Sequence, residues 1–318
     1  MFDVSSKSRT ARVAKAQSVL KTLPGTIRLI QERRVPKGDP LEVAKVAAIQ
    51  AAKNTAQIIP YCHPLPLDHV AVEYELGDDQ IQVTVTVKAI YKTGVEMEAL
   101  TAAAVGALTL YDMLKMLDDS LAIHEVRLIE KRGGKSDLTV EGSRRVRAAV
   151  VVMSDSISAG RKTDVSGRLI VERLQSAQVE VVEYLVISDE AGVIEQTLIH
   201  CADQLGADLV LTTGGTGLGP RDHAPEVLAR IIDREAPGIA EAARAYGQER
   251  TPFAMLSRGK SGVRGRTLIV NLPGSPRGVA ESLDALLGPI LHAFPMMEGC
   301  GHTADATGGG GACRADLG

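Results

Sequence analysis

The chain has 318 residues, of which 45% are hydrophobic and 24% charged, and its formal net charge is −3. This length predicts about two domains, and the composition is that of a globular protein in which each half can close its own core. The four cysteines, Cys62, Cys201, Cys300 and Cys313, are widely spaced, which argues against a disulfide framework and against a zinc site.

The N-terminus has no apolar core of the signal-peptide type, and no run of about twenty apolar residues occurs. We therefore expect a cytoplasmic protein with no membrane partner. The first fifty residues are basic, with ten Lys and Arg against four acids, which suits an anionic ligand. Because aromatic residues for base stacking are not interleaved with these cations, a phosphorylated small molecule is favoured over nucleic acid.

The first half predicts an α+β domain. Asp39 can cap the helix that follows it, and the next stretch is apolar on most faces, as a buried helix is. Two alternating segments separated only by residues 77–79 predict a β-hairpin, with a long helix packed on one of its faces. We expect a ferredoxin-like layered antiparallel sheet over residues 1–145. Its elements are a helix over 41–56, strands over 69–76 and 80–91, a helix over 95–117 and a strand over 126–130.

After Arg147 the predicted strands become continuously apolar and alternate with helical stretches, which is typical of parallel strands buried on both faces. We expect residues 146–298 to form a doubly wound, mostly parallel α/β sheet with its ligand beyond the carboxyl ends of the strands. Residues 299–318 are rich in glycine and are expected to be a disordered tail. The predicted strands cover 148–153, 180–187, 208–212 and 267–271, and the last helix runs to about Phe294.

Asp112 and Lys115 lie three residues apart near the end of the long predicted helix, so they share one face. A carboxylate and an amine held side by side can transfer protons, although most pairs at this spacing are surface ion pairs of little energetic weight. Other polar residues of this half also have plain explanations. Lys37 can simply precede a helix cap, Lys53 can end a helix, and His63 between two prolines can be a rigid turn residue.

Six motifs that occur in order along this half favour a functional role over these plain explanations. They are residues 3–5, 37–39, 48–53, 59–65, 92–101 and 111–115. Together they make residues 1–137 resemble the cyclic pyranopterin monophosphate synthase family of molybdenum-cofactor biosynthesis. The resemblance implies conversion of (8S)-3′,8-cyclo-7,8-dihydroguanosine 5′-triphosphate to cyclic pyranopterin monophosphate and diphosphate, without a cofactor. The last residues, 131–136, resemble the closing Gly-Gly-Lys-Ser segment of that family, so Lys131 and Lys135 are further candidates.

The resemblance also assigns roles. Rebuilding the guanine rings requires protons to move at several atoms, and cyclising a phosphate while diphosphate leaves builds negative charge that fixed cations stabilise. We therefore expect Asp112, Lys115, Lys53 and Lys37 to be catalytic. The residues expected to bind substrate are Tyr61, Cys62, His63, Met97, Glu98 and Arg12.

Glu98 and Asp112 are fourteen residues apart on the same predicted helix. At 1.5 Å per residue a straight helix separates them by about 21 Å, which one compact ligand does not bridge. We expect the two ends of the helix to serve different copies of the site. Each site is then completed by a neighbouring subunit of a homo-oligomer.

In the second half, two glycine-rich segments follow predicted strands, at residues 212–217 and 271–274. Backbone amides in such loops cradle phosphate, although about half of these loops are only tight turns. Asp189, after a third strand, and Asp222 can both reach a Mg²⁺ ion, for which helix N-capping is the plain alternative. This edge of the sheet is therefore suited to binding a nucleotide.

Together with residues 154–155 and 164–167, these motifs make residues 146–295 resemble the molybdopterin-binding, molybdopterin adenylyltransferase family. The resemblance implies transfer of AMP from ATP to the terminal phosphate of molybdopterin with the help of Mg²⁺. Some members bind molybdopterin without adenylylating it, so a non-catalytic binding or scaffolding module is the alternative. We expect a metal at Asp189 and Asp222, and ligand contacts from Thr213, Gly214, Gly215, Thr216, Gly217, Pro273, Gly274 and Ser275.

Overall fold

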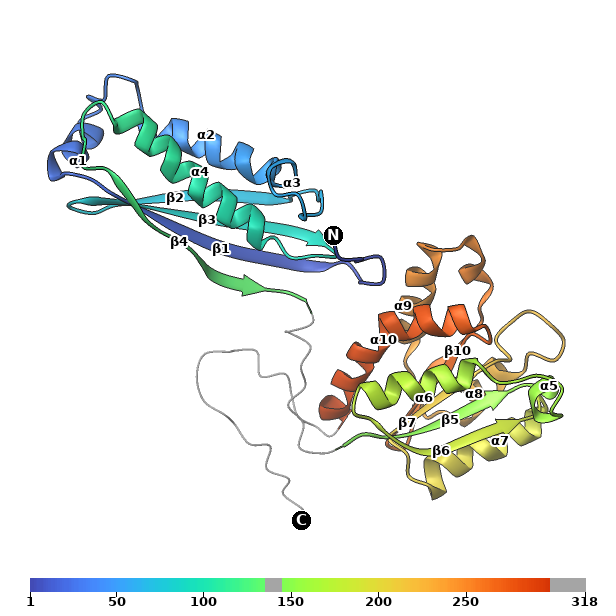
Figure 1. Cartoon of the computed structure of the whole chain (residues 1–318). Helices are drawn as coiled ribbons and strands as arrows, with labels where there is room; N and C mark the ends of the chain where they lie inside the picture. The colour runs from blue at the N-terminus through green and yellow to red at the C-terminus, as the bar shows by residue number, and fades with distance from the viewer. Residues whose placement is uncertain (135–144, 298–318) are drawn as a thin grey trace, which may run out of the picture. The chain divides into compact units, whose positions relative to one another are not determined.

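The computed structural model of the chain describes residues 1–134 and 145–297 (Figure 1). The chain divides into two compact units, Met1–Asp137 and Leu138–Gly318. The predicted tail over 299–318 and the candidate Lys135 lie outside the described residues. The predicted boundary between residues 145 and 146 falls at the edge of the undescribed stretch and stays a prediction.

The first unit is a four-stranded antiparallel sheet with helices packed on one face (Figure 1). The strand order is β2-β3-β1-β4, and every neighbouring pair is antiparallel. Because the two long helices lie on one face, their apolar sides and the inner side of the sheet form one core. The elements are β1 (Thr10–Lys21), α1 (Pro24–Gln31), α2 (Pro40–Lys53), α3 (Thr55–Ile58), β2 (His69–Leu76), β3 (Gln80–Tyr91), α4 (Glu96–Leu114) and β4 (Ala122–Arg132).

The hairpin of β2 and β3 has the predicted bounds, because alternate residues of β3 are apolar and face the helices. Ile81, Val83, Val85 and Val87 are fully buried there. On the helix side, Gly106 of α4 lets the layers approach closely. A Cβ added to it would lie 3.2 Å from Val83 Cγ1 and 3.6 Å from the Cβ of Ala48 in α2.

The sequence prediction lacked β1, which lies between β3 and β4 in the sheet. Its inward side chains are mostly small: Ala14, Ala16 and Ser18 precede Leu20, and all four are fully buried. Ser18 Oγ donates a hydrogen bond to the Ala103 carbonyl of α4, 2.7 Å away. Small inward residues and a basic, polar outer face give a weak alternating pattern, so the strand is recognised only from its partners.

Carboxylates fix the ends of the helices. Asp39 caps α2 as predicted, because its Oδ1 accepts hydrogen bonds from the amides of Leu41 and Glu42 at 3.1 and 3.3 Å. The helix ends at Lys53 rather than residue 56. After α4, the buried Asp118 accepts hydrogen bonds from Thr22, Leu23, Thr26 and Ser120, which ties the end of β1 to the turn before β4.

The second unit is an α/β fold with a six-stranded sheet in the order β6-β5-β7-β10-β9-β8. The first four strands are parallel and the last two pairings are antiparallel, so the mostly parallel sheet was predicted correctly. The two short antiparallel strands, β9 and the edge strand β8, were not predicted. The strands are β5 (Arg147–Met153), β6 (Glu180–Ile187), β7 (Leu209–Thr213), β8 (Arg234–Glu235), β9 (Ser261–Arg264) and β10 (Thr267–Leu272).

Helices cover both faces of this sheet (Figure 1). On one face α6 (Ser166–Ser176), α9 (Pro237–Gln248) and α10 (Pro276–Met297) share a core with the strands, and on the other α7 (Ala191–Ile199) and α8 (Ala224–Ile231) do so. The short helical segments are α5 (Asp155–Ser158), the π-helix η2 (His200–Gln204) and the 3-10 helix η3 (Pro252–Leu256). Since parallel strands share one direction, the loops after β5, β6, β7 and β10 meet at one edge, where the candidate residues lie.

Within the described residues, only α4 has the length and composition of a membrane-spanning helix, with a mean hydropathy of 1.2 over its most apolar window. Half of that window is buried inside the first unit. The apolar character of α4 therefore has a sufficient explanation in core packing.

Candidate functional site

Three charged side chains of the first unit meet where α4 ends and α2 begins. Lys115 Nζ lies 2.7 Å from Asp112 Oδ1, and Lys37 Nζ lies 3.2 Å from Asp112 Oδ2 and 2.7 Å from the Asp112 carbonyl oxygen. Hydrogen bonds and charge from Lys115, and then from Lys37, lower the pKa of Asp112, while Asp112 raises the pKa of Lys115. The free protein therefore holds a carboxylate between two ammonium groups, and the side chain of Asp112 remains 59% exposed to a substrate.

The other end of α4 borders a cavity of about 560 Å³. Five of the six predicted substrate-binding residues line it, namely Tyr61, Cys62, His63, Met97 and Glu98. Glu98 is 5% exposed, and its burial raises its pKa, with a further rise from the charge of Glu96. His63 Nε2 lies 2.8 Å from the Phe2 carbonyl oxygen, so the N-terminal segment also reaches this cavity.

Arg12 and Lys53 lie outside the lining of this cavity. Arg12 Nε donates a hydrogen bond to the Tyr91 carbonyl at 3.3 Å, and a Cβ on Gly134 would lie 2.1 Å from Arg12 Nη1. Gly134 has φ +103°, so the glycine turn after β4 wraps closely around the guanidinium. Lys131 Nζ pairs with Glu96 Oε1 at 2.6 Å, and Glu96 lines the cavity.

Helices α2 and α4 run antiparallel, because Lys37 just before α2 contacts Asp112 near the end of α4, while Ala48 faces Gly106 farther back. Lys53, the last residue of α2, is therefore at the cavity end of the pair. The predicted synthase residues form two groups in one chain rather than one. Glu98 and Asp112 belong to the same uninterrupted helix, which keeps the groups about 21 Å apart.

In the second unit the two glycine-rich loops touch each other. A Cβ on Gly274 would lie 3.3 Å from the Cα of Gly214. Thr213 Oγ1 donates a hydrogen bond to the Pro273 carbonyl at 2.7 Å, and Ser166 Oγ donates to the Gly274 carbonyl at 2.9 Å. Two hydroxyls therefore fix successive peptide planes of the second loop beside the first.

The predicted metal residues lie at the same edge. Asp189 Oδ2 accepts a hydrogen bond from the Asp155 amide at 3.0 Å, and Asp155 Oδ1 accepts one from the Asp189 amide at 3.1 Å. Asp222 Oδ2 accepts from the Gly219 amide at 2.7 Å. Neither Asp189 nor Asp222 is the N-cap of the helix after it, so the plain alternative of capping does not account for them.

Burial raises the pKa of Asp189, and the nearby negative charges of Asp155 and Asp222 contribute to the rise. The positive charge of Arg221, which pairs with Asp155 at 2.8 Å, acts in the opposite direction and offsets part of this repulsion. A divalent cation would offset more of it. Over the described ranges, no group of three His, Cys, Asp or Glu side chains is placed to hold a metal. Asp189 and Asp222 offer carboxylate oxygens, and Mg²⁺ is commonly held by one or two carboxylates together with substrate phosphates and water.

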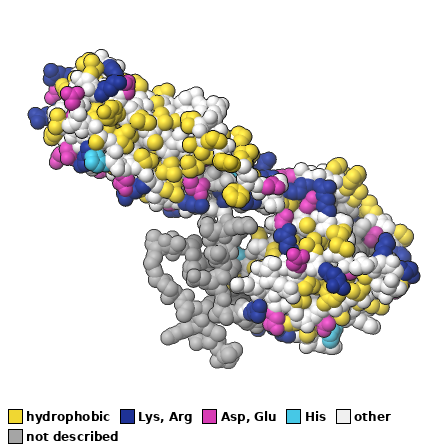
Figure 2. All heavy atoms as spheres, in the orientation of Figure 1, with side chains coloured by type: hydrophobic (Ala, Val, Ile, Leu, Met, Phe, Trp, Pro, Cys, Tyr) yellow, Lys and Arg dark blue, Asp and Glu magenta, His cyan; other side chains and the backbone are white. Residues whose placement is uncertain are grey.

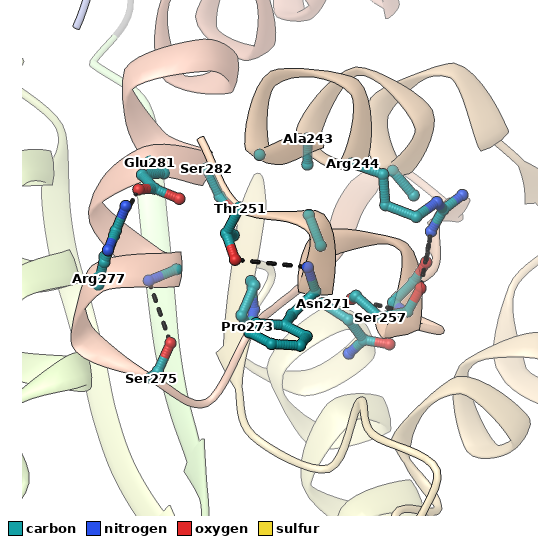
Figure 3. Close-up of a pocket in the computed structure, with 16 residues that line it drawn as sticks. Ala243, Arg244, Thr251, Ser257, Asn271, Pro273, Ser275, Arg277, Glu281 and Ser282 are labelled. Atoms are coloured by element: carbon teal, nitrogen blue, oxygen red, sulfur yellow. Dashed lines mark hydrogen bonds and ion pairs between the residues drawn. The ribbon is translucent and has the colours of Figure 1, made fainter. Parts of the chain in front are cut away.

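A cavity of about 310 Å³ opens beside these loops, between α9, η3 and the start of α10 (Figure 3). The predicted residues Pro273 and Ser275 line it, and so does Asn271. Asn271 Nδ2 donates to Thr212 Oγ1 at 2.5 Å, but its buried Oδ1 has no hydrogen-bond partner. An unsatisfied buried acceptor costs about 1–3 kcal/mol, so a ligand with an N–H or O–H group would gain from meeting it. In the sequence Asn271 opens the segment 271–274, but it was not among the predicted ligand contacts.

Comparisons with known proteins agree with this arrangement. Residues 1–134 match the MoaC family, and residues 149–293 match the family described as "Probable molybdopterin binding domain". The two units are therefore a MoaC domain followed by a domain of the molybdopterin-binding class.

Similar proteins have the same pair of domains. A molybdenum cofactor biosynthesis bifunctional protein of Chlorobaculum tepidum is 45% identical over 95% of this chain and 96% of its own length. Its counterpart in Synechococcus elongatus is 38% identical over 95% of this chain and 98% of its own length. A cyclic pyranopterin monophosphate synthase of a Nostoc species is 54% identical over 43% of this chain and 82% of its own length. The chain belongs to the family of molybdenum cofactor biosynthesis bifunctional proteins, as the motifs predicted.

Proposed function

We propose that the first unit is a cyclic pyranopterin monophosphate synthase that converts (8S)-3′,8-cyclo-7,8-dihydroguanosine 5′-triphosphate to cyclic pyranopterin monophosphate and diphosphate. The observation that carries this proposal is the placement of Asp112 between Lys37 and Lys115 in a MoaC domain. The β-α-β-β-α-β order of the main elements supports the further proposal that this domain is ferredoxin-like.

The chemistry follows from the charges. Asp112 is ionised and can accept a proton from the substrate, while Lys115 and Lys37 carry protons that they can donate to ring nitrogens or to a leaving oxygen. As the phosphate cyclises, the same ammonium groups stabilise the departing diphosphate. His63, Lys53 and Arg12 are proposed to add positive charge, and the buried Glu98 to accept hydrogen bonds from the base.

We propose that each complete synthase site joins the cavity end of one α4 to the charged end of a neighbour's α4 in a homo-oligomer. The separation of the two groups along one helix supports this arrangement. Apolar side chains left exposed on α4 and β4 support it as well, because association would remove them from water. These are Leu108, Tyr111, Val126, Leu128 and Ile129, each at least 38% exposed. Figure 2 shows many apolar side chains at the surface of the first unit.

Complementation tests the shared site. Glu98→Ala and Asp112→Asn chains should each lose synthase activity, about 100- to 10,000-fold for the acid–base residue. In mixed oligomers, a site built from the cavity of the Asp112→Asn chain and the charged end of the Glu98→Ala chain is intact. Product measured by mass spectrometry should reappear on mixing. A chain with both substitutions, mixed with either single variant, is the control and should restore nothing.

Two outcomes count against these proposals. If well-mixed oligomers remain inactive, the two ends of α4 do not act together in a site shared between subunits. An Asp112→Asn chain that makes product at the wild-type rate would remove Asp112 from catalysis.

For the second unit we propose Mg²⁺-dependent adenylylation of molybdopterin by ATP. The contact between the two glycine-rich loops, beside Asp189 and Asp222, carries this proposal. Backbone amides of residues 214–217 and 274–275 are proposed to bind the phosphates, and Asp189 and Asp222 to hold the cation. A bound Mg²⁺ would neutralise phosphate charge during in-line displacement. Asn271 lines the neighbouring cavity, and its buried Oδ1 has no hydrogen-bond partner. This supports placing the pterin, which is rich in N–H groups, in that cavity.

A binding or scaffolding module is the second candidate, because the matching family is described by molybdopterin binding rather than by a reaction. Incubating the chain with ATP, Mg²⁺ and molybdopterin distinguishes the two. Adenylylated molybdopterin that is lost in Asp222→Asn identifies an enzyme, and binding without product identifies a carrier. Since every proposed ligand is a phosphorylated small molecule, we also propose a cytoplasmic protein that has neither a nucleic-acid nor a membrane partner.

A further inference from the structure

Arg258 lies between η3 and β9 and contacts the glycine-rich loop after β7 through both its backbone and its side chain. Its backbone amide donates to the Thr216 carbonyl at 2.9 Å. Its side chain donates from Nε to the Gly217 carbonyl at 2.7 Å and from Nη2 to the Asp222 carbonyl at 2.6 Å. Nη1 pairs with Glu226 in the first turn of α8.

The loop that these bonds hold would otherwise be very flexible. Four of its nine residues, 214–222, are glycines, and glycine has the largest backbone freedom to lose on ordering. Inside the loop, Asp222 Oδ2 accepts the Gly219 amide. Arg258 ties two points of the loop together from outside it, because one planar guanidinium fixes the carbonyl of Gly217 and the carbonyl of Asp222 relative to each other.

The charge of Arg258 is already paired within the protein. Glu226 compensates it, and three of its donors already face protein acceptors. These protein contacts account for an arginine here without a direct phosphate contact. The requirement is for a rigid fork, which a lysine with its single ammonium cannot replace at three acceptors.

We propose that Arg258 is a positioning residue: it preorganises the loop over residues 214–222 for phosphate and holds the backbone from which the Asp222 carboxylate projects. This inference rests on the proposed nucleotide binding by the second unit. A loop ordered before binding loses less conformational entropy when the ligand arrives, so the contribution of Arg258 is measured as affinity.

The test compares Arg258→Met and Arg258→Lys with the wild-type chain. Arg230→Met is the matched control, because Arg230 in α8 pairs with Glu195 at 2.9 Å on the exposed surface. Hydrogen exchange of residues 214–222 reports loop order, and titration calorimetry reports the Kd of Mg²⁺·ATP. In both Arg258 variants we expect faster loop exchange and a Kd roughly 10- to 100-fold higher, because the ligand must then order the loop that these hydrogen bonds held. The control should stay within about twofold.

Exchange of the buried β7 amides checks that each variant is folded. Wild-type affinity in both Arg258 variants would overturn the inference, and so would full affinity in Arg258→Lys alone, which would make charge rather than the fork decisive. A wild-type chain that binds no Mg²⁺·ATP refutes the proposed nucleotide binding instead. Loop exchange then decides alone whether Arg258 orders the loop, and unchanged exchange would overturn that too.

Discussion

Replacing Gly214 with alanine tests the geometry of the second site. Gly214 follows β7 directly and has φ +104°, a conformation that L-residues rarely adopt. A Cβ there would lie 2.2 Å from the Met153 carbonyl oxygen. Met153 ends β5, which is paired on both sides by β6 and β7, so the obstructing backbone cannot move away easily.

Two costs add up in this substitution. The positive φ costs an alanine about 1–2 kcal/mol relative to its usual conformations. Relieving the contact with a rigid backbone atom costs about 1–3 kcal/mol, as overpacking does elsewhere. We therefore expect Gly214→Ala to lower the free energy of unfolding of the second unit by about 2–5 kcal/mol. The loop would also shift, so Mg²⁺·ATP binding should weaken.

Hydrogen exchange of the buried amides of β7 and β10, followed as urea increases, measures this free energy without a contribution from the first unit. Gly192→Ala is the control. Gly192 lies in α7, and a Cβ there would meet no atom within 4 Å. This change should leave stability equal or raise it by about 0.5–1 kcal/mol. The reasoning is refuted if Gly214→Ala unfolds within about 0.5 kcal/mol of the wild type.

Three carboxylates elsewhere in the chain, Asp118, Glu98 and Asp164, give further predictions. Asp118→Ala should destabilise the first unit by about 3–5 kcal/mol in urea unfolding, because five hydrogen bonds to a buried carboxylate are lost. Burial alone would raise the pKa of Asp118, but these hydrogen bonds hold it well below its usual value. Its stabilisation should therefore be present above about pH 4 and decline as pH falls toward the folded-state pKa. Glu98→Gln should stabilise the unit at neutral pH while removing synthase activity, because burial raises the pKa of Glu98. That stability gain should vanish below about pH 4, where Glu98 is protonated in both states. Tyr184→Phe should cost about 1–2 kcal/mol in the same unfolding assay, since Tyr184 donates a 2.5 Å hydrogen bond to the Asp164 carboxylate.

Each of these has a contrary result. A pH-independent effect of Asp118→Ala would show that its ionised form is not what stabilises the fold. A Glu98→Gln chain that is less stable at pH 7 would mean that the carboxylate has a stabilising cation, against the burial seen here. Wild-type stability of Tyr184→Phe would make the hydrogen bond to Asp164 energetically neutral.

The sequence by itself determined the elements in which apolar residues recur with the period of a strand or a helix. The strands β2, β3 and β6 have the predicted bounds, and the apolar parallel strands predicted the α/β class of the second unit. The motifs identified the family as well, because residue types in a fixed order are local information. The local pattern did not predict β1, because the inward alanines and serine of this strand are only weakly hydrophobic.

Only the tertiary structure decided which residues meet. Lys37 and Asp112 are 75 positions apart and form an ion pair, whereas Glu98 and Asp112 share one helix and are held apart by it. Arg258 lay outside every motif, and the motif at residues 271–274 did not reveal that the buried Oδ1 of Asn271 has no hydrogen-bond partner. The physical reason is that periodicity reports which face of an element is buried, while contacts between distant residues depend on how strands pair and helices pack.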